Sequence, residues 1–172
     1  MVMKTYICGG EKYACDKGYI YMPIKIADTL PKSIEVEGNT LILKSSFHAS
    51  LLCVKNILAE QNKELEQKII ESFCKFASEN DISFVKFTGE FRFSEFEERK
   101  TILARCEISN LEKFSNQLSK ELNIEIPTQP THITLYTLQS DLGIGLNSFT
   151  ELEEKSRVID IPSEVGHNLA LS

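Results

Sequence analysis

The feature that most constrains the fold is a change of hydrophobic period near residue 56. From Asn56 to about Asn80 the large apolar residues recur at helical spacing, at Leu58, Leu65, Ile69, Phe73 and Phe76. Because this spacing gathers them on one face and leaves charged residues on the other, it predicts an amphipathic helix. The segments around it alternate apolar and polar residues, which is typical of half-buried strands. Such a chain favours an α+β fold.

The alternating runs predict strands on both sides of this helix. They span residues 40–54, 82–87, 91–96, 99–108, 130–137 and, near the end, 157–161. A turn is predicted at Thr88-Gly89-Glu90, between two of these strands. A second helix is predicted to begin at a capping box formed by Ser109 and Glu112 and to end before Pro127. Residues 141–148 are expected to form a glycine-bearing loop.

The organisation expected from these elements is one two-lobed domain over residues 1–172. Residues 1–39 are the least periodic part, and we expect there a β-rich N-terminal addition, with a strand interrupted at Pro23 and no chemistry of its own. A core follows over residues 40–161. Residues 162–172 are expected to form a loosely held tail.

Composition narrows the classes of partner. The hydrophobic fraction of 42% and charged fraction of 26% are those of a soluble globular protein. The net charge of −6 argues against binding to duplex DNA or to an anionic membrane, but it allows a local phosphate site. No apolar window reaches the roughly 18 residues of a membrane-spanning helix, and the first ten residues are too mixed for a signal peptide.

The cysteines predict a reducing compartment. There are five, an odd number, and they are scattered without a Cys-x-x-Cys spacing. A cytoplasmic protein with free thiols fits this pattern better than a disulfide scaffold or a zinc site.

Two short motifs carry the chemistry. His48-Ala49-Ser50-Leu51 and His132-Ile133-Thr134-Leu135 both read histidine, any residue, a hydroxyl residue and leucine, and both lie in predicted strands. Since residues two apart in a strand share a face, each histidine is expected to project together with its hydroxyl residue, while each leucine turns away. A single such triplet is most often structural. The pair, about half a chain apart, predicts one site with two imidazoles and two hydroxyls.

This set of groups suits acid–base chemistry at a phosphodiester. Histidine has an ordinary pKa of about 6.5, so one imidazole can accept a proton while the other donates one. The hydroxyls of Ser50 and Thr134 can donate hydrogen bonds to phosphate oxygens. Neither triplet contains a carboxylate or a second histidine, so we expect no metal and no cofactor. His167, which has no hydroxyl two residues on, is expected to be structural or disordered.

Three further residues are weaker candidates for substrate binding. Lys44 and Tyr136 share strand faces with the histidines, where they can contact a base or a phosphate, although packing at the cleft edge explains them equally well. Arg105 alternates away from Ile102 and Cys106, so it can face the cleft.

The paired motifs, their separation and the order of elements between them resemble the two-histidine phosphoesterase superfamily, which includes RNA 2′,3′-cyclic phosphodiesterases and 2′-5′ RNA ligases. The resemblance covers about residues 40–160. It implies two pseudo-symmetric lobes with antiparallel sheets lining a central cleft and helices outside. It also implies metal-independent cleavage of a cyclic or linear phosphodiester of RNA or a nucleotide. His48 and His132 would be the acid–base pair, and Ser50 and Thr134 the phosphate-binding hydroxyls.

Other interpretations stay open at this point. The same fold could serve as a non-catalytic nucleotide- or RNA-binding module, or as a structural domain with coincidental histidines. The sequence also leaves open which histidine is the acid and which is the base.

Overall fold

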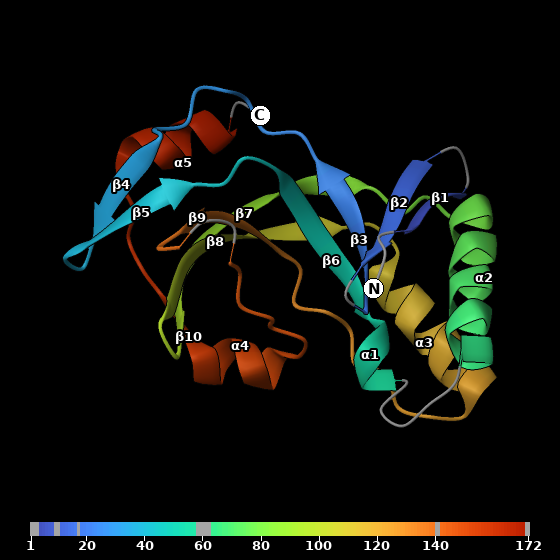
Figure 1. Ribbon diagram of the computed structural model, residues 1–172. Coiled ribbons are helices and arrows are strands. Elements are labelled where there is room, and N and C mark those ends of the chain that lie inside the picture. Colours follow the sequence, from blue (N-terminus) through green and yellow to red (C-terminus); the bar gives the residue numbers. More distant parts are fainter. Residues whose placement is uncertain (1–3, 9–10, 17, 58–62, 140–141, 171–172) are drawn as a thin grey trace.

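The sheet dominates the architecture (Figure 1). The computed structural model describes residues 4–8, 11–16, 18–57, 63–139 and 142–170. Within them ten strands pair antiparallel in one open sheet, and five helices accompany it. Eight of the strands follow the order β1-β2-β3-β6-β9-β8-β7-β10. The hairpin β4–β5 joins this sheet through the pairing of β5 with β9. The α+β class is therefore confirmed, as one continuous sheet.

The element bounds follow the predicted periods closely in the middle of the chain. The strands are β1 (Lys4–Cys8), β2 (Glu11–Asp16), β3 (Tyr19–Ile24), β4 (Ser33–Val36), β5 (Asn39–Leu43), β6 (Phe47–Cys53), β7 (Phe84–Phe96), β8 (Arg99–Ile108), β9 (His132–Thr137) and β10 (Ser156–Val158). The helices are α1 (Val54–Ile57), α2 (Lys63–Glu79), α3 (Leu111–Leu122), α4 (Phe149–Lys155) and α5 (Ser163–Ala170).

The predicted helix over 56–80 is confirmed for α2, while residues 58–62, including Leu58, lie outside the described residues. Its apolar face packs on α3 and on the sheet, in a core that contains Ile69, Phe73, Phe76, Phe114 and Leu118. The rings of Phe73 and Phe114 meet edge to face at 5.3 Å between centroids. The predicted amphipathic face is therefore the face that is buried.

The capping box at the start of α3 is wrong. Asn110 is the N-cap, in the left-handed region with φ of 58°, and its side chain makes no capping hydrogen bond. The Ser109 hydroxyl is engaged elsewhere: it donates to the carbonyl oxygen of Asp81 at 2.6 Å and accepts from the backbone N–H of Ser83 at 2.8 Å. A long-range contact between two loops has replaced the local one.

The single strand predicted over 40–54 is two strands, β5 and β6. The chain leaves the ladder at residues 44–46, yet both strands lie along β9, because β5 pairs through Leu43 with Tyr136 and β6 pairs through Ala49 with Ile133. Between them the backbone N–H of Lys44 donates to the carbonyl oxygen of Leu135 at 2.9 Å. Period alone could not locate this break.

The predicted turn at residues 88–90 is also wrong, since β7 runs through it as one strand. The register with β8 shifts there: Phe87 pairs with Cys106 and Phe91 with Ala104, so extra residues of β7 are accommodated as an irregularity. Gly89 has φ of +86°, a conformation that glycine adopts without steric cost. Gly89 therefore lies at a bulge within β7 and not at a turn between two strands.

The C-terminal segment is ordered, so the prediction of a loose tail is wrong over residues 163–170. It forms α5, whose Val165 and Leu169 are fully buried in a second core together with Ile102, Ala104 and Ile133 of the sheet. The strand predicted over 157–161 is the shorter β10, which pairs with β7.

Helix α4, the short acidic segment, covers the opposite face of the sheet. Its Leu152 packs on Leu103 together with Ile144 and Leu146 of the preceding loop. Leu103 alternates with Ile102 and Ala104 along β8, which explains how one strand contacts α5 on one side and α4 on the other.

The N-terminal residues are β-rich, as predicted, but they continue the main sheet. Strand β3 pairs with β6 and passes through Pro23, which lies opposite His48, so the predicted interruption is absent. Proline is tolerated there because the pairing of β3 with β2 extends only to Tyr21, which leaves β3 an edge beyond that point.

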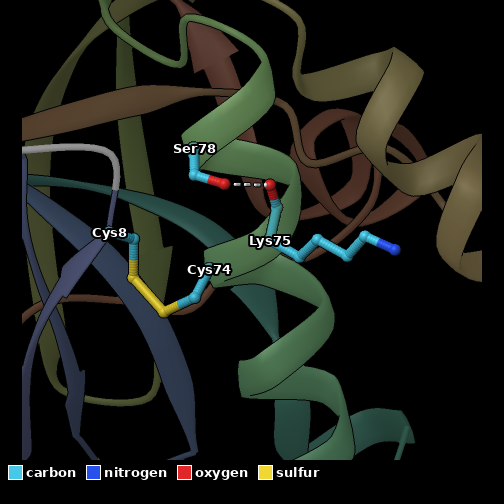
Figure 2. The surroundings of a disulfide bond; sticks show 4 residues. All are labelled: Cys8, Cys74, Lys75 and Ser78. Carbon is cyan, nitrogen blue, oxygen red and sulfur yellow. Dashed lines mark hydrogen bonds between the residues drawn. A yellow bond between two sulfur atoms is a disulfide. The ribbon is translucent and has the colours of Figure 1, made fainter.

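A disulfide joins Cys8 of β1 to Cys74 of α2 (Figure 2). The prediction of free thiols is wrong for this pair, whose 66-residue separation leaves no sequence signature. The other three cysteines, Cys15, Cys53 and Cys106, are buried and lie outside this disulfide. Among the helices in the described part of the chain, none has the length and apolar character needed to cross a membrane.

Candidate active site

The two histidine motifs lie side by side at the centre of the sheet. Strands β6 and β9 pair antiparallel at Ala49 and Ile133, the middle residues of the two motifs. Because the strands are antiparallel, the flanking residues run in opposite order, with His48 on the side of Thr134 and Ser50 on the side of His132.

All four motif residues line one pocket. Ala49 and Ile133 are fully buried on the core side, so their neighbours project from the other face of the sheet. There the half-buried His48, Ser50, His132 and Thr134 line a pocket of about 360 Å³.

Both motifs contain an irregularity at the same position. In the pairing of β6 with β3, Ile20 lies opposite Leu52 and Tyr21 opposite Ser50, so Leu51 is the extra residue. In the pairing of β9 with β8, Leu135 is extra in the same way, between Thr134 and Tyr136. The leucine of each motif is thus a bulged residue, and bulges re-aim the side chains around them.

The bulge at Leu135 decides where Tyr136 lies. Simple alternation placed Tyr136 on the face of His132, but the extra residue turns it into the core, where its exposed fraction is 0%. Its hydroxyl donates to the carbonyl oxygen of Pro31 at 3.0 Å, and burial raises the pKa of Tyr136 to about 12. Tyr136 is therefore a core residue in this structure, outside the pocket.

Lys44 and Arg105 have different positions relative to the pocket. Lys44 lines it, at the end where β5 leaves the ladder. Arg105 is the Cα partner of His132 across β8 and β9, and its Nε donates to the carbonyl oxygen of Thr131 at 3.0 Å. Its guanidinium lies 5.5 Å from the ring centroid of Phe149. Arg105 therefore contacts the backbone next to His132 and does not line the pocket.

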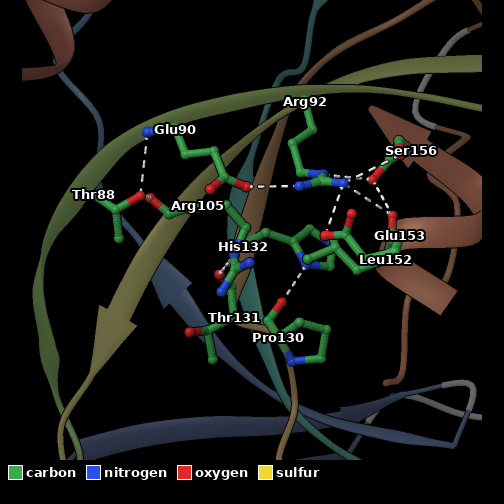
Figure 3. A network of polar contacts seen from close by, with 10 residues as sticks. All are labelled: Thr88, Glu90, Arg92, Arg105, Pro130, Thr131, His132, Leu152, Glu153 and Ser156. Carbon is green, nitrogen blue, oxygen red and sulfur yellow. Dashed lines mark hydrogen bonds and ion pairs between the residues drawn. The ribbon is translucent and has the colours of Figure 1, made fainter. Parts of the chain in front are cut away.

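The environment of His132 defines its protonation. Its Nδ1 lies 2.8 Å from the carbonyl oxygen of Pro130, an acceptor, so Nδ1 carries the proton (Figure 3). Burial, and secondarily the positive charge of Arg105, lower the pKa of His132 below its ordinary value of 6.5, against the opposing effect of the Pro130 contact. Near neutral pH the ring is therefore neutral, and Nε2 has a lone pair available as a proton acceptor.

Sequence reasoning missed one wall of the pocket. Tyr19 and Tyr21 of β3 form this wall, and the ring centroids of Tyr21 and His48 lie 4.7 Å apart. Residues 142–147 of the glycine-bearing loop, which the sequence predicts as a rim of the cleft, form the other wall. The tyrosines alternate with the buried Ile20 and Met22, a pattern that could have placed them on the polar face, but nothing local indicated that β3 would pair with β6.

The loop wall is held close to β3. At Gly145 a Cβ atom would lie 2.9 Å from the hydroxyl oxygen of Tyr19, so no other residue fits there without displacement. Ser148 then caps α4, accepting from the N–H of Glu151 at 3.1 Å. Buried Arg92 of β7 secures α4 through contacts with Glu153, Ser156 and the carbonyl oxygen of Leu152 (Figure 3).

The charges around the pocket are of one sign. Its described lining contains the cations Lys44, Lys55 and Arg99 and no aspartate or glutamate, in a chain whose net charge is −6. Such a concentration of positive charge in an acidic protein favours an anionic ligand.

Metal ligands do not gather in the described part of the chain, where no group of three or more histidine, cysteine, aspartate or glutamate residues could hold an ion. In comparisons with known proteins, no protein-family model, no curated protein and no solved structure matches this chain.

Proposed function

We propose that the pocket is the active site of a metal-independent phosphodiesterase that acts on a cyclic or linear phosphodiester of RNA or a nucleotide. The observation that carries this proposal is the convergence of His48, Ser50, His132 and Thr134 on one pocket, in which the charged residues of the described lining are all cations. Two imidazoles supply proton transfer, two hydroxyls supply hydrogen bonds, and the cations attract the phosphate.

His132 is the general base in this proposal. Its Nδ1–H is held by Pro130, so Nε2 can take a proton from the attacking water. As the water oxygen forms its bond to phosphorus, the bond from phosphorus to the leaving ribose oxygen breaks. That oxygen takes a proton from His48, which acts as the imidazolium. The products are a phosphate ester and a free hydroxyl, with the two histidines left in exchanged protonation states.

Ser50 and Thr134 stabilise the transition state. Because Ser50 and Thr134 line the same pocket as the two histidines, their hydroxyls can donate to non-bridging oxygens of a phosphate held between the imidazoles. Negative charge on those oxygens grows as the reaction proceeds, so the hydrogen bonds strengthen where they accelerate the reaction.

A two-lobed organisation like that of the two-histidine phosphoesterases is part of the proposal. Three observations support it: the matching motifs, the bulged leucine in each, and the antiparallel register that relates one motif to the other about the pair Ala49 and Ile133. Each half would then contribute one histidine and one hydroxyl.

The pH profile tests the assigned roles. With EDTA present, we expect turnover within a panel of nucleoside 2′,3′-cyclic phosphates and of 2′-5′ and 3′-5′ linked oligonucleotides, with a bell-shaped profile of kcat/KM. The rising limb reports loss of the proton from the base. Because the pKa of His132 is lowered, this limb should lie below pH 6.5.

Substituting Arg105 should move that limb. Arg105→Gln removes a cation that lowers the pKa of His132, so the rising limb should shift to higher pH. Lys120→Gln, the same loss of charge on α3, serves as the control and should leave the limb in place. A limb that Arg105→Gln does not move would contradict the role given to His132, and sensitivity of turnover to EDTA would contradict the metal-independent mechanism.

A further inference from the structure

The cations of the pocket lie at two separate ends, on either side of the four motif residues. Lys55 follows β6, beyond the Ser50 and His132 end of the site. Arg99 begins β8, beyond the His48 and Thr134 end. If the proposed function holds, the positions of these cations determine where the substrate carries its other phosphates.

Lys55 is fixed in position although it is exposed. Cys53, the last residue of β6, lies three steps of about 3.3 Å beyond Ser50, so the backbone of Lys55 lies about 10 Å or more from Ser50. Its backbone N–H donates to the carbonyl oxygen of Gly18 at 3.0 Å. A Cβ atom on Gly18 would lie 2.6 Å from the Cβ atom of Lys55, so the Lys55 side chain packs directly on Gly18. Its Nζ lies 4.9 Å from the ring centroid of Tyr19.

Arg99 is held at the opposite end. Leu103 of β8 is the partner of Thr134, and Arg99 lies four residues earlier, which is about 13 Å along the strand. Its Nη1 donates to the carbonyl oxygen of Gly143 in the loop wall at 3.4 Å. Lys44 lines the pocket at the same end, next to Leu135.

Among the ion pairs of the described residues, none involves Lys55 or Arg99. Both line the pocket, and their backbones lie at opposite ends of it, about 10 Å or more along the strands from the motif residues. Each is placed to contact a second phosphate, one step removed from the reacting one.

We propose that Lys55 and Arg99 form two phosphate subsites that flank the reacting phosphodiester, and that the substrate is a single-stranded oligonucleotide with a further phosphate on each side. A nucleoside cyclic phosphate carries a single phosphate and engages neither subsite. A nucleotide with additional phosphates on one side engages only one. An oligonucleotide engages both, and each contact is a charge-assisted hydrogen bond.

Four versions of one dinucleotide test the two subsites separately. They carry no terminal phosphate, a 5′-phosphate, a 3′-phosphate or both, around the linkage that the enzyme cleaves. We expect each phosphate to raise kcat/KM about tenfold, as a charge-assisted contact does. Lys55→Gln should abolish the gain from one phosphate, and Arg99→Gln the gain from the other.

Matched variants separate a phosphate contact from a structural effect. Lys55→Arg and Arg99→Lys keep the charge and should keep most of the gain, while Lys120→Gln on α3, none of whose residues line the pocket, should keep both gains in full. Raising the salt concentration should weaken binding of the doubly phosphorylated dinucleotide most, because more counterions are displaced when it binds.

The outcomes that overturn the inference differ from those that overturn the proposed function. Equal kcat/KM for all four dinucleotides, or a gain from one phosphate alone, would remove the two flanking subsites and leave a phosphodiesterase of another specificity. The same holds if both variants lose the same gain. If no phosphodiester is turned over at all, the proposed function itself fails.

Discussion

His48→Ala and His132→Ala are each expected to reduce kcat for phosphodiester hydrolysis by at least about a hundredfold. A positioned general acid or base contributes typically about 10²–10⁴-fold, and each variant removes one of the two. Because the two groups act in the same step, the double variant should be little slower than the slower single one. The measurement is initial rate under saturating substrate, in EDTA.

The third histidine is the matched control for this prediction. His167 lies exposed on α5 and does not line the pocket, so His167→Ala should retain the wild-type rate. His132→Gln keeps a polar side chain of similar size at this half-buried position. A loss of rate in this variant as well would therefore reflect the loss of the imidazole and not unfolding. Wild-type rates in both His48→Ala and His132→Ala would show that these residues are not catalytic.

The largest expected effect on stability comes from Arg92. This side chain is 4% exposed and contacts Glu90 and Glu153 at 3.0 Å each, together with the Ser156 hydroxyl at 2.8 Å. Arg92→Met keeps much of the volume but removes the donor to the part-buried hydroxyl and carbonyl oxygens of Ser156, directly after α4. We expect the free energy of unfolding to fall by about 2–3 kcal/mol. Chemical denaturation followed by circular dichroism measures it.

An exposed arginine gives the comparison. Arg157 pairs with Glu37 at the surface, where both side chains are about half exposed. Arg157→Gln should cost less than about 1 kcal/mol, because solvent and salt screen such a pair. If the two substitutions cost the same, burial of the Arg92 network does not stabilise the attachment of α4.

The sequence predicted the elements whose periodicity is long and regular. The helical spacing of Ile69, Phe73 and Phe76 and the alternation along 99–108 both correspond to real elements, α2 and β8. Along α2 one face is buried, so the local pattern and the tertiary structure agree. Strand β8 forms as predicted, although both of its faces are buried, one under α5 and the other under α4.

The errors fall where tertiary contacts override the pattern. A bulge adds one residue to β9, and alternation then misplaces Tyr136. The sequence around Gly89 predicts a turn, but Gly89 lies within one continuous strand. The Ser109 hydroxyl is predicted to cap α3, but it forms hydrogen bonds with Asp81 and Ser83. Each depends on partners that are distant in sequence, so no local window contains the necessary information.

The candidate site shows the same division. The motifs at His48 and His132 could be found because their residues are informative in themselves, and the structure places them in adjacent strands. Tyr19, Lys55 and Arg99 carry no local signature, and only the pairing of β3 with β6 and of β8 with β9 brings them to the same pocket.

We expect both histidines to bind one phosphate, and nuclear magnetic resonance of the imidazole nitrogens during titration with inorganic phosphate measures this binding. The chain has three histidines, so each can be assigned from one substitution. The signals of His48 and His132 should shift with one common midpoint while those of His167 do not move. A response from one of the pair alone, or two different midpoints, would contradict this expectation.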